Sequence, residues 1–269
     1  GIIFPTPQPP ISVEYKMDAD TSRRFFYTLN VLSDDKFDPH LHYARYRAVE
    51  FLKPEYRAKY RNAVHVGQTL AGIYRVHMVK RLESSFHAFK LSLATLLRIT
   101  NDMLKMFAEN KVIIAPELNV KELQAKKMEL DQIIELAMKK GYQESDILYK
   151  SEDFEPDFIE MLRHDKEVLE VLNADWQKEH DDQKFDLFQE KLKHEFFDER
   201  NVSGKLVVFS ESVDTLNYLK GRLENELGRT DVLTITADNR DKKTSIIKEN
   251  FDANSEVQKN QYNIILTSD

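Results

Sequence analysis

Hydroxyl and carboxylate residues follow three short apolar runs near the carboxyl end of the chain. The runs are 206–209, 232–235 and 264–266, and each is rich in β-branched or aromatic residues, as buried strands are. The carboxyl ends of parallel strands meet at one edge of an open sheet, where ligands bind. Side chains at these tips could therefore contact a phosphate-bearing ligand. The tip residues are Ser210 and Glu211, Ala237 and Asp238, and Thr267, Ser268 and Asp269.

Two helix-sized connections, 211–230 and 238–261, separate these runs. Strand, helix, strand, helix, strand is the order of a βαβαβ unit with right-handed crossovers and a parallel sheet. The sequence therefore predicts an α/β end.

The middle of the chain has helical periodicity. Apolar residues recur at alternating spacings of three and four along 86–107, which predicts one helix with a single buried stripe. Ser84 or Ser85 can cap its start. Further helices are expected at 68–82, 119–140, 154–174 and 180–199. The stripe consists of Phe86, Phe89, Leu93, Leu96, Thr100, Met103 and Phe107.

The predicted fold class is mainly α with an α/β end, in which a helical subdomain precedes a parallel three-stranded sheet. The expected organisation is an extended leading segment at 1–39, the helical subdomain at 40–203 and the sheet at 204–269. The helical subdomain has a basic part, 40–81, and an acidic part, 82–203.

Residues 204–269 resemble the second RecA-like lobe of superfamily 2 helicases, most closely the Swi/Snf-like branch of bacterial ATP-dependent helicases. Residues 205–210 match the first strand of that lobe (motif IV), and 264–269 match the opening of motif V. Residues 79–85, followed by Phe86 and Phe89, are similar to a segment between the two lobes, and 182–187 to the helix that leads into lobe two. The resemblance implies that Ser210, Thr267 and Ser268 lie near a nucleic-acid backbone.

This chain departs from the family pattern at several points. Ala237 to Asn239 stand where a glycine usually follows the second strand, and motif VI is not reached. No G-x-x-x-x-G-K-[ST] loop for cradling triphosphates occurs. The resemblance implies ATP and Mg²⁺ in the intact protein, bound mostly by a first RecA-like lobe outside this chain. We expect these residues alone to be inactive, and no catalytic or cofactor-binding residue is assigned.

Charge is distributed unevenly. The segment 40–81 carries nine basic and two acidic residues, whereas 82–203 carries 17 basic and 27 acidic ones, in a chain of net charge −7. Cationic residues with interleaved tyrosines suit contact with a phosphate backbone. The alternative is a solvated helical face that pairs with the acidic segment. The cations assigned to nucleic acid, with double-stranded DNA as the expected partner, are Arg57, Lys59, Arg61, Lys80 and Arg81.

Other site types find little support. The chain has no cysteine, which excludes disulfides, thiolate zinc sites and cysteine nucleophiles. His40 and His42 with Asp38 could begin a metal site, but no third ligand stands at a diagnostic spacing, so none is expected. Neither a membrane span nor a signal peptide is recognised, and a cytoplasmic location is expected.

Two functions from different classes remain. The first is part of a nucleic-acid-dependent ATPase, a helicase or DNA translocase. The second is a non-enzymatic helical scaffold for protein interaction with an α/β cap, which predicts no salt-sensitive DNA binding. A small-molecule enzyme on a doubly wound sheet is disfavoured, because 209–212 is not a glycine-rich turn.

Overall fold

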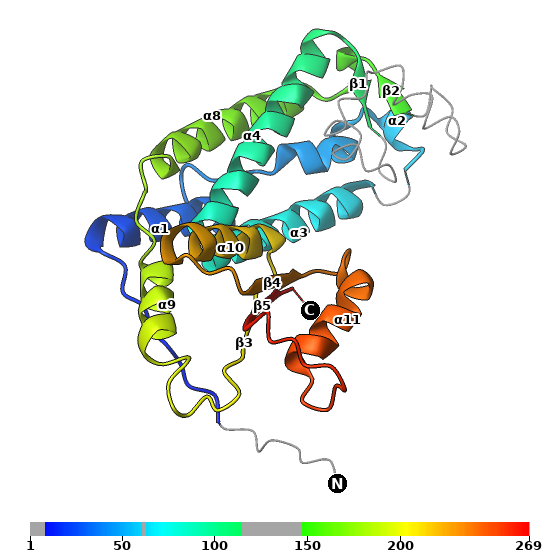
Figure 1. The fold of residues 1–269 in the computed structure, drawn as a ribbon. Coiled ribbons are helices and arrows are strands. Elements are labelled where there is room, and N and C mark those ends of the chain that lie inside the picture. The colour runs from blue at the N-terminus through cyan, green and yellow to red at the C-terminus, as the bar shows by residue number, and fades with distance from the viewer. Residues whose placement is uncertain (1–8, 61–62, 115–146, 269) are drawn as a thin grey trace. The chain divides into compact units, whose positions relative to one another are not determined.

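The computed structural model describes residues 9–60, 63–114 and 147–268 (Figure 1). The chain forms two compact units, a helical unit and a sheet unit. The helical unit consists of 24–179 and 211–218, and the sheet unit of 1–23, 180–210 and 219–269. This division differs from the expected boundaries at 39/40 and 203/204. It runs through two helices, α1 (Ala19–Ser33) and α10 (Val213–Leu227).

In the helical unit, α4 packs against both α3 and α8, and the 3-10 helix η1 also packs against both of them (Figure 1). A short antiparallel pair, β1 with β2, contacts the end of α4. The elements are α1 (Ala19–Ser33), η1 (Ala44–Phe51), α2 (Pro54–Arg57), α3 (Ala63–Ser84), α4 (Phe86–Ala108), β1 (Val112–Ile113), β2 (Leu148–Tyr149), η2 (Ser151–Asp153) and α8 (Pro156–Trp176).

The predicted stripe on α4 is confirmed, since every one of its residues is buried. Of the two predicted caps, Ser84 and Ser85, the structure has Ser85, whose Oγ accepts a hydrogen bond from the backbone N–H of Ala88 at 3.0 Å. At this end of the helix, the rings of Phe86 and Phe89 pack on Trp176, with centroids 5.0 and 5.2 Å apart. The only tryptophan of the chain is thus fully buried in the helical unit.

The other end of α4 contributes to an aromatic core. Phe107 and Phe154 both pack on Phe158, which is fully buried on α8. Apolar residues of η1 and β1 complete this cluster, among them Val49 and Val112. Burial of such side chains is the main favourable term in folding of the unit.

One buried carboxylate joins α8 to the start of η1. Asp165 is 3% exposed and accepts hydrogen bonds from the backbone N–H groups of His42 and Ala44, both at 2.7 Å. Tyr43 between them has φ of 55°, a left-handed conformation that a non-glycine residue rarely adopts. The two bonds to Asp165 hold this turn.

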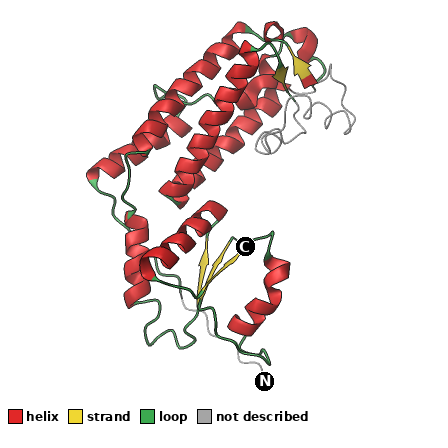
Figure 2. Ribbon diagram, turned by 45° about the horizontal axis from the view of Figure 1, so that its top comes forward, coloured by secondary structure: helices red, strands yellow, loops and turns green. Residues whose placement is uncertain are grey.

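The sheet unit contains three parallel strands in the order β3-β5-β4, with α10 and α11 on opposite faces (Figures 1 and 2). The predicted mainly helical fold with a parallel βαβαβ end is confirmed. The elements of this part are α9 (Gln183–His194), β3 (Leu206–Phe209), α10 (Val213–Leu227), β4 (Val232–Ile235), α11 (Arg240–Phe251) and β5 (Ile264–Thr267).

Helix α11 covers only part of its face of the sheet. Leu233, Ile235 and Ile265 are buried there against apolar residues of α11. The strand register places Val207 beside Ile265 and Phe209 beside Thr267, hence on the same face. Val207 and Phe209 are nevertheless 45% and 67% exposed, so the outer strand has an uncovered apolar face.

Two expectations from the sequence differ from the structure, and a third falls on residues that the structure does not describe. The expectation of an extended segment at 1–39 is wrong for Ala19–Ser33, which is helical. Asp18 caps this helix, because its carboxylate accepts hydrogen bonds from the backbone N–H groups of Asp20 and Thr21. The helix expected at 238–261 ends at Phe251. The helix expected at 119–140 lies outside the described residues.

We predict that Asp165→Ala destabilises the helical unit by roughly 2–4 kcal/mol, because two buried backbone N–H groups lose their acceptor. Urea unfolding followed by the fluorescence of Trp176 measures this loss in the helical unit. Glu167→Ala, at an exposed position in the middle of the same helix, is the control and should change little. A loss for Asp165→Ala no larger than the control's would contradict the role of the carboxylate.

Candidate nucleic-acid interface

Main-chain hydrogen bonds align the tips of the three strands. The N–H of Ser210 donates to the carbonyl of Thr267 at 3.0 Å, and the N–H of Ser268 donates to the carbonyl of Ile235 at 3.4 Å. The three residues predicted near a nucleic-acid backbone, Ser210, Thr267 and Ser268, therefore come from neighbouring strands at one edge.

Their side chains differ in exposure. Ser210 and Ser268 are half-buried, whereas Thr267 is only 5% exposed. Because successive strand residues point to opposite faces, the side chain of Thr267 lies on the face that α11 covers. The hydroxyls of the two serines are better placed for a ligand at this edge.

The residues that follow β4, where this chain departs from the family pattern, have a structural role. Asn239 Oδ1 accepts a hydrogen bond from the N–H of Thr236 at 3.0 Å, and Lys243 Nζ donates to the carbonyl of Thr234 at 2.8 Å. Asn239 and Lys243 thus close the turn at the tip of β4. In the sequence, Asn239 stood out only as part of a departure from the family pattern, and no spacing singled out Lys243.

The predicted cations differ in their bonds and in their exposure. The Arg57 guanidinium donates to the carbonyl of Glu50 at 2.9 Å, and Arg81 forms an ion pair with Asp214 at 2.8 Å. Lys59 is exposed. Arg61 lies outside the described residues.

Lys80 is the most accessible of the paired cations. Its Nζ lies 2.9 Å from Glu211, and both side chains are more than half exposed. Exposed ion pairs of this kind contribute about 0–1 kcal/mol. A phosphate could therefore replace Glu211 as the partner of Lys80.

Other cations of the basic segment also have partners in the helical unit. Arg45 donates to the carbonyl of Ile99 at 3.0 Å, Arg47 pairs with Glu50 at 2.7 Å, and Arg75 pairs with Asp35 at 2.6 Å. Among the described basic residues of 40–81, at least six make bonds within the helical unit. The positive charge of this segment is smaller on the surface than in the sequence.

The join of α3 and α4 contacts residues 211–218, which belong to the helical unit and include the first turns of α10. The hydroxyl of Thr215 is hydrogen-bonded to those of Ser84 and Ser85, at 2.9 and 3.0 Å. The rings of His87 and Tyr218 stack with centroids 4.7 Å apart. We call Lys80, Arg81, Ser84, Ser85 and His87, together with these partners on 211–218, the α3–α4 joint.

Arg81 occupies an unusual place in the joint. Its Nη1 donates to Ser212 Oγ and to Asp214, beside the N-terminus of α10. A cation is unfavourable at the positive end of a helix dipole, and the carboxylate of Asp214 offsets this. The segment 79–85, singled out by resemblance, thus holds the turn that follows the first strand.

Three histidines form a cluster in the helical unit. The ring of His42 lies 4.4 Å from that of His40 and 4.7 Å from that of His164, centroid to centroid. His164 comes from α8, so sequence spacing could not reveal it. Among the described residues, no group of histidine, aspartate or glutamate side chains has the geometry of a metal site.

Burial changes two pKa values beside this cluster. Burial lowers the pKa of His42 to about 4, and the neighbouring His40, His164 and Arg47 act in the same direction. Burial raises the pKa of Asp165 to about 6, although its hydrogen bonds from the Ala44 and His42 N–H groups oppose this. The fold thus favours neutral His42.

Comparisons of the chain with protein-family models, with curated proteins and with solved structures gave no match. Among the helices of the described residues, none is both long and apolar enough to cross a membrane.

A pH dependence follows from His42. Its folded pKa lies below the unfolded value, so its contribution to stability is present above about pH 6.5 and is lost as the pH falls toward 4. For Asp165, whose pKa is raised, stability is instead lost as the pH rises from about 4 to 6.

We predict that His42→Asn reduces the loss of stability between pH 7 and pH 5 by about 1 kcal/mol, discounted for the partly exposed ring. Urea titrations at both pH values, followed by Trp176 fluorescence, measure it. The Asp165 contribution is common to both proteins and cancels in the comparison. Equal pH dependence in the two proteins would refute the assignment.

We also predict that Thr215→Val loosens the α3–α4 joint, because the isosteric side chain cannot bond to Ser84 or Ser85. A lost hydrogen bond of about 1.4 kcal/mol corresponds to tenfold faster amide exchange in 211–218. Hydrogen exchange with mass spectrometry measures this, with Thr69→Val at an exposed site on α3 as the matched control. Unchanged exchange in that peptide would show that the hydroxyl contributes nothing.

Proposed function

We propose that this chain is part of a nucleic-acid-dependent ATPase of the helicase or DNA-translocase type. It contributes nucleic-acid contacts and the beginning of the second motor lobe. The observation that carries this proposal is the parallel β3-β5-β4 sheet, whose aligned tips bring Ser210 and Ser268 to one edge. In open parallel sheets this is the edge where ligands bind.

ATP and Mg²⁺ belong to the intact motor in this proposal. The 269 residues contain no glycine-rich loop with the lysine that cradles a triphosphate. A first RecA-like lobe therefore supplies most of the nucleotide site, and this chain alone does not hydrolyse ATP. The absence of cysteine is in keeping with a cytoplasmic protein.

The proposed DNA contacts combine hydroxyls with a few accessible cations. The hydroxyls of Ser210 and Ser268 can donate to phosphate oxygens, as serine side chains commonly do in DNA complexes. Lys59 and Lys80 provide charge, since both are exposed. Arg57 and Arg81 act mainly within the helical unit, given their bonds to Glu50 and Asp214.

A scaffold function remains the second candidate, and the outer face of α3 favours it. Leu70, Ile73 and Val76 are spaced by three residues and are 36%, 57% and 55% exposed. Apolar residues on the outside of a helix commonly contact another protein. The internal pairing of most cations in 40–81 also favours this candidate.

We predict that Lys59→Glu with Lys80→Glu weakens binding to labelled double-stranded DNA at least about tenfold. The slope of log affinity against log salt should become shallower by about 2, one for each lost phosphate contact. Fluorescence anisotropy over a salt series measures both quantities. Lys105→Glu with Lys166→Glu makes the same charge change at exposed or half-exposed ion-paired lysines on α4 and α8, and should bind like the unchanged protein.

Absence of binding at low salt would reject the motor proposal and leave the scaffold. Equal weakening by the two double variants would show that only net charge matters, which would reject Lys59 and Lys80 as contacts.

A further inference from the structure

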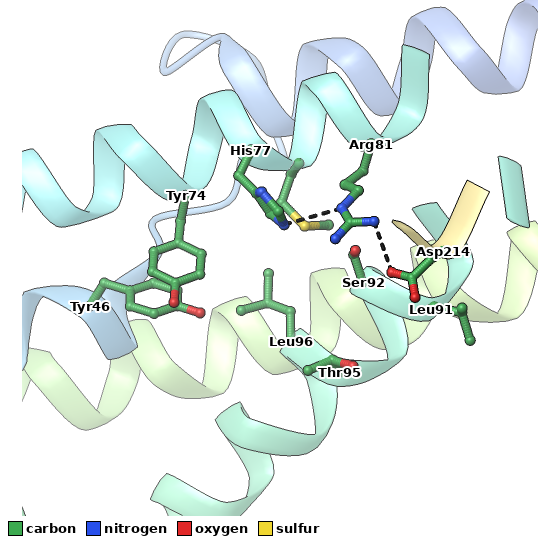
Figure 3. A pocket seen from close by; sticks show the side chains of 10 residues that line it. Tyr46, Tyr74, His77, Arg81, Leu91, Ser92, Thr95, Leu96 and Asp214 are labelled. Carbon is green, nitrogen blue, oxygen red and sulfur yellow. Dashed lines mark hydrogen bonds and ion pairs between the residues drawn. The ribbon is translucent and has the colours of Figure 1, made fainter. Parts of the chain in front are cut away.

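A pocket of about 430 Å³ lies within the helical unit, between α3, α4, η1 and the first turn of α10 (Figure 3). Its volume is in the range of small-molecule sites. The lining residues are Tyr46, Tyr74, His77, Met78, Arg81, Leu91, Ser92, Thr95, Leu96 and Asp214.

One end of the pocket is aromatic. The rings of Tyr46 and Tyr74 stack with centroids 3.5 Å apart and planes inclined by 14° (Figure 3). The ring of His77 stands edge-on to Tyr74 at 6.3 Å. Met78 and Leu96, both buried, add apolar surface between these rings and the other end. Flat rings and apolar side chains of this kind suit a planar ligand.

The other end combines a cation with an anion. Arg81 Nη1 bonds to one carboxylate oxygen of Asp214 at 2.8 Å. Within the described part of the chain, Nη2 of Arg81 and the second oxygen of Asp214 make no hydrogen bond. The pocket thus presents a donor next to an acceptor, while the two charges cancel.

These features specify the ligand. The carboxylate of Asp214 offsets the charge of Arg81, so the pocket has no net positive charge to attract a phosphate. A planar, uncharged ring with a hydrogen-bond acceptor beside a donor fits both ends. The exposed pairing edge of an unstacked nucleobase has this pattern, and proteins read such bases by stacking and by hydrogen bonds to that edge.

We propose that this pocket binds one unpaired nucleobase of a single strand. This inference rests on the proposed nucleic-acid function and adds a substrate class to it, a single strand or an opened duplex end. Tyr74 and His77 contact the base ring, and Arg81 with Asp214 contacts its pairing edge. Ser92 and Thr95 lie beside the ring and limit its size.

The test uses a pocket-filling variant of the full chain. Thr95→Trp places an indole in the pocket from an exposed position on α4, whereas Ala94→Trp adds the same group at the exposed neighbour outside the lining. The probes are a short labelled single strand, the same strand with abasic sites, and a duplex of the same sequence. Circular dichroism during heating confirms that both variants fold.

We expect the unchanged protein and Ala94→Trp to bind the intact strand about tenfold more tightly than the abasic strand, as loss of base stacking costs roughly that factor. Thr95→Trp should bind the two strands equally and keep its affinity for the duplex.

The two proposals fail in distinguishable ways. Salt-dependent duplex binding, together with single-strand binding that is the same for intact and abasic probes, would overturn the pocket while leaving the nucleic-acid function in place. Failure to bind any probe would overturn both. Equal losses in Thr95→Trp and Ala94→Trp would also overturn the pocket.

Discussion

The hydroxyl of Thr215 connects the starts of two helices. A helix begins with backbone N–H groups that have no partner within the helix, and here Ser85 and Ser212 each accept one such bond. Because Thr215 bonds to Ser84 and Ser85, the capping of α4 and the position of the first turn of α10 depend on each other. This contact also places Asp214 at the end of the pocket.

Arginines account for much of the difference between charge in the sequence and charge on the surface. In the segment 40–81, several guanidinium groups bond to backbone carbonyls or to carboxylates of the same unit. A planar guanidinium with five donors suits such internal roles better than an ammonium group does. Lysines of the segment are therefore better candidates for external partners than its arginines.

Helices and strands that show local periodicity could be predicted from the sequence. The stripe along 86–107, its Ser85 cap and the three strands of the sheet agree with the structure to within about one residue. These elements bury one face or both, so the spacing of their apolar residues predicts the type of element. The first helix was missed, although Asp18 followed by the apolar residues of Ala19–Ser33 was a readable start.

Contacts between distant segments could not be predicted in the same way. His164 joins His40 and His42 only because α8 folds back on the turn before η1, and Asp214 reaches Arg81 across more than a hundred residues. Hydrogen bonds of this kind depend on tertiary packing and leave no spacing in the sequence. The candidate pocket is lined by residues of four elements, so it could not be predicted from the sequence.

The outer strand of the sheet has a consequence for handling the protein. In the described structure, β3 pairs only with β5, and its Val207 and Phe209 are exposed on the part of the face that α11 leaves uncovered. A strand with unpaired backbone groups and apolar side chains is a template for pairing with a second chain. A second copy of the chain that paired along β3 would extend the sheet and cover Val207 and Phe209, so replacing these two side chains with polar ones would remove the apolar part of that contact.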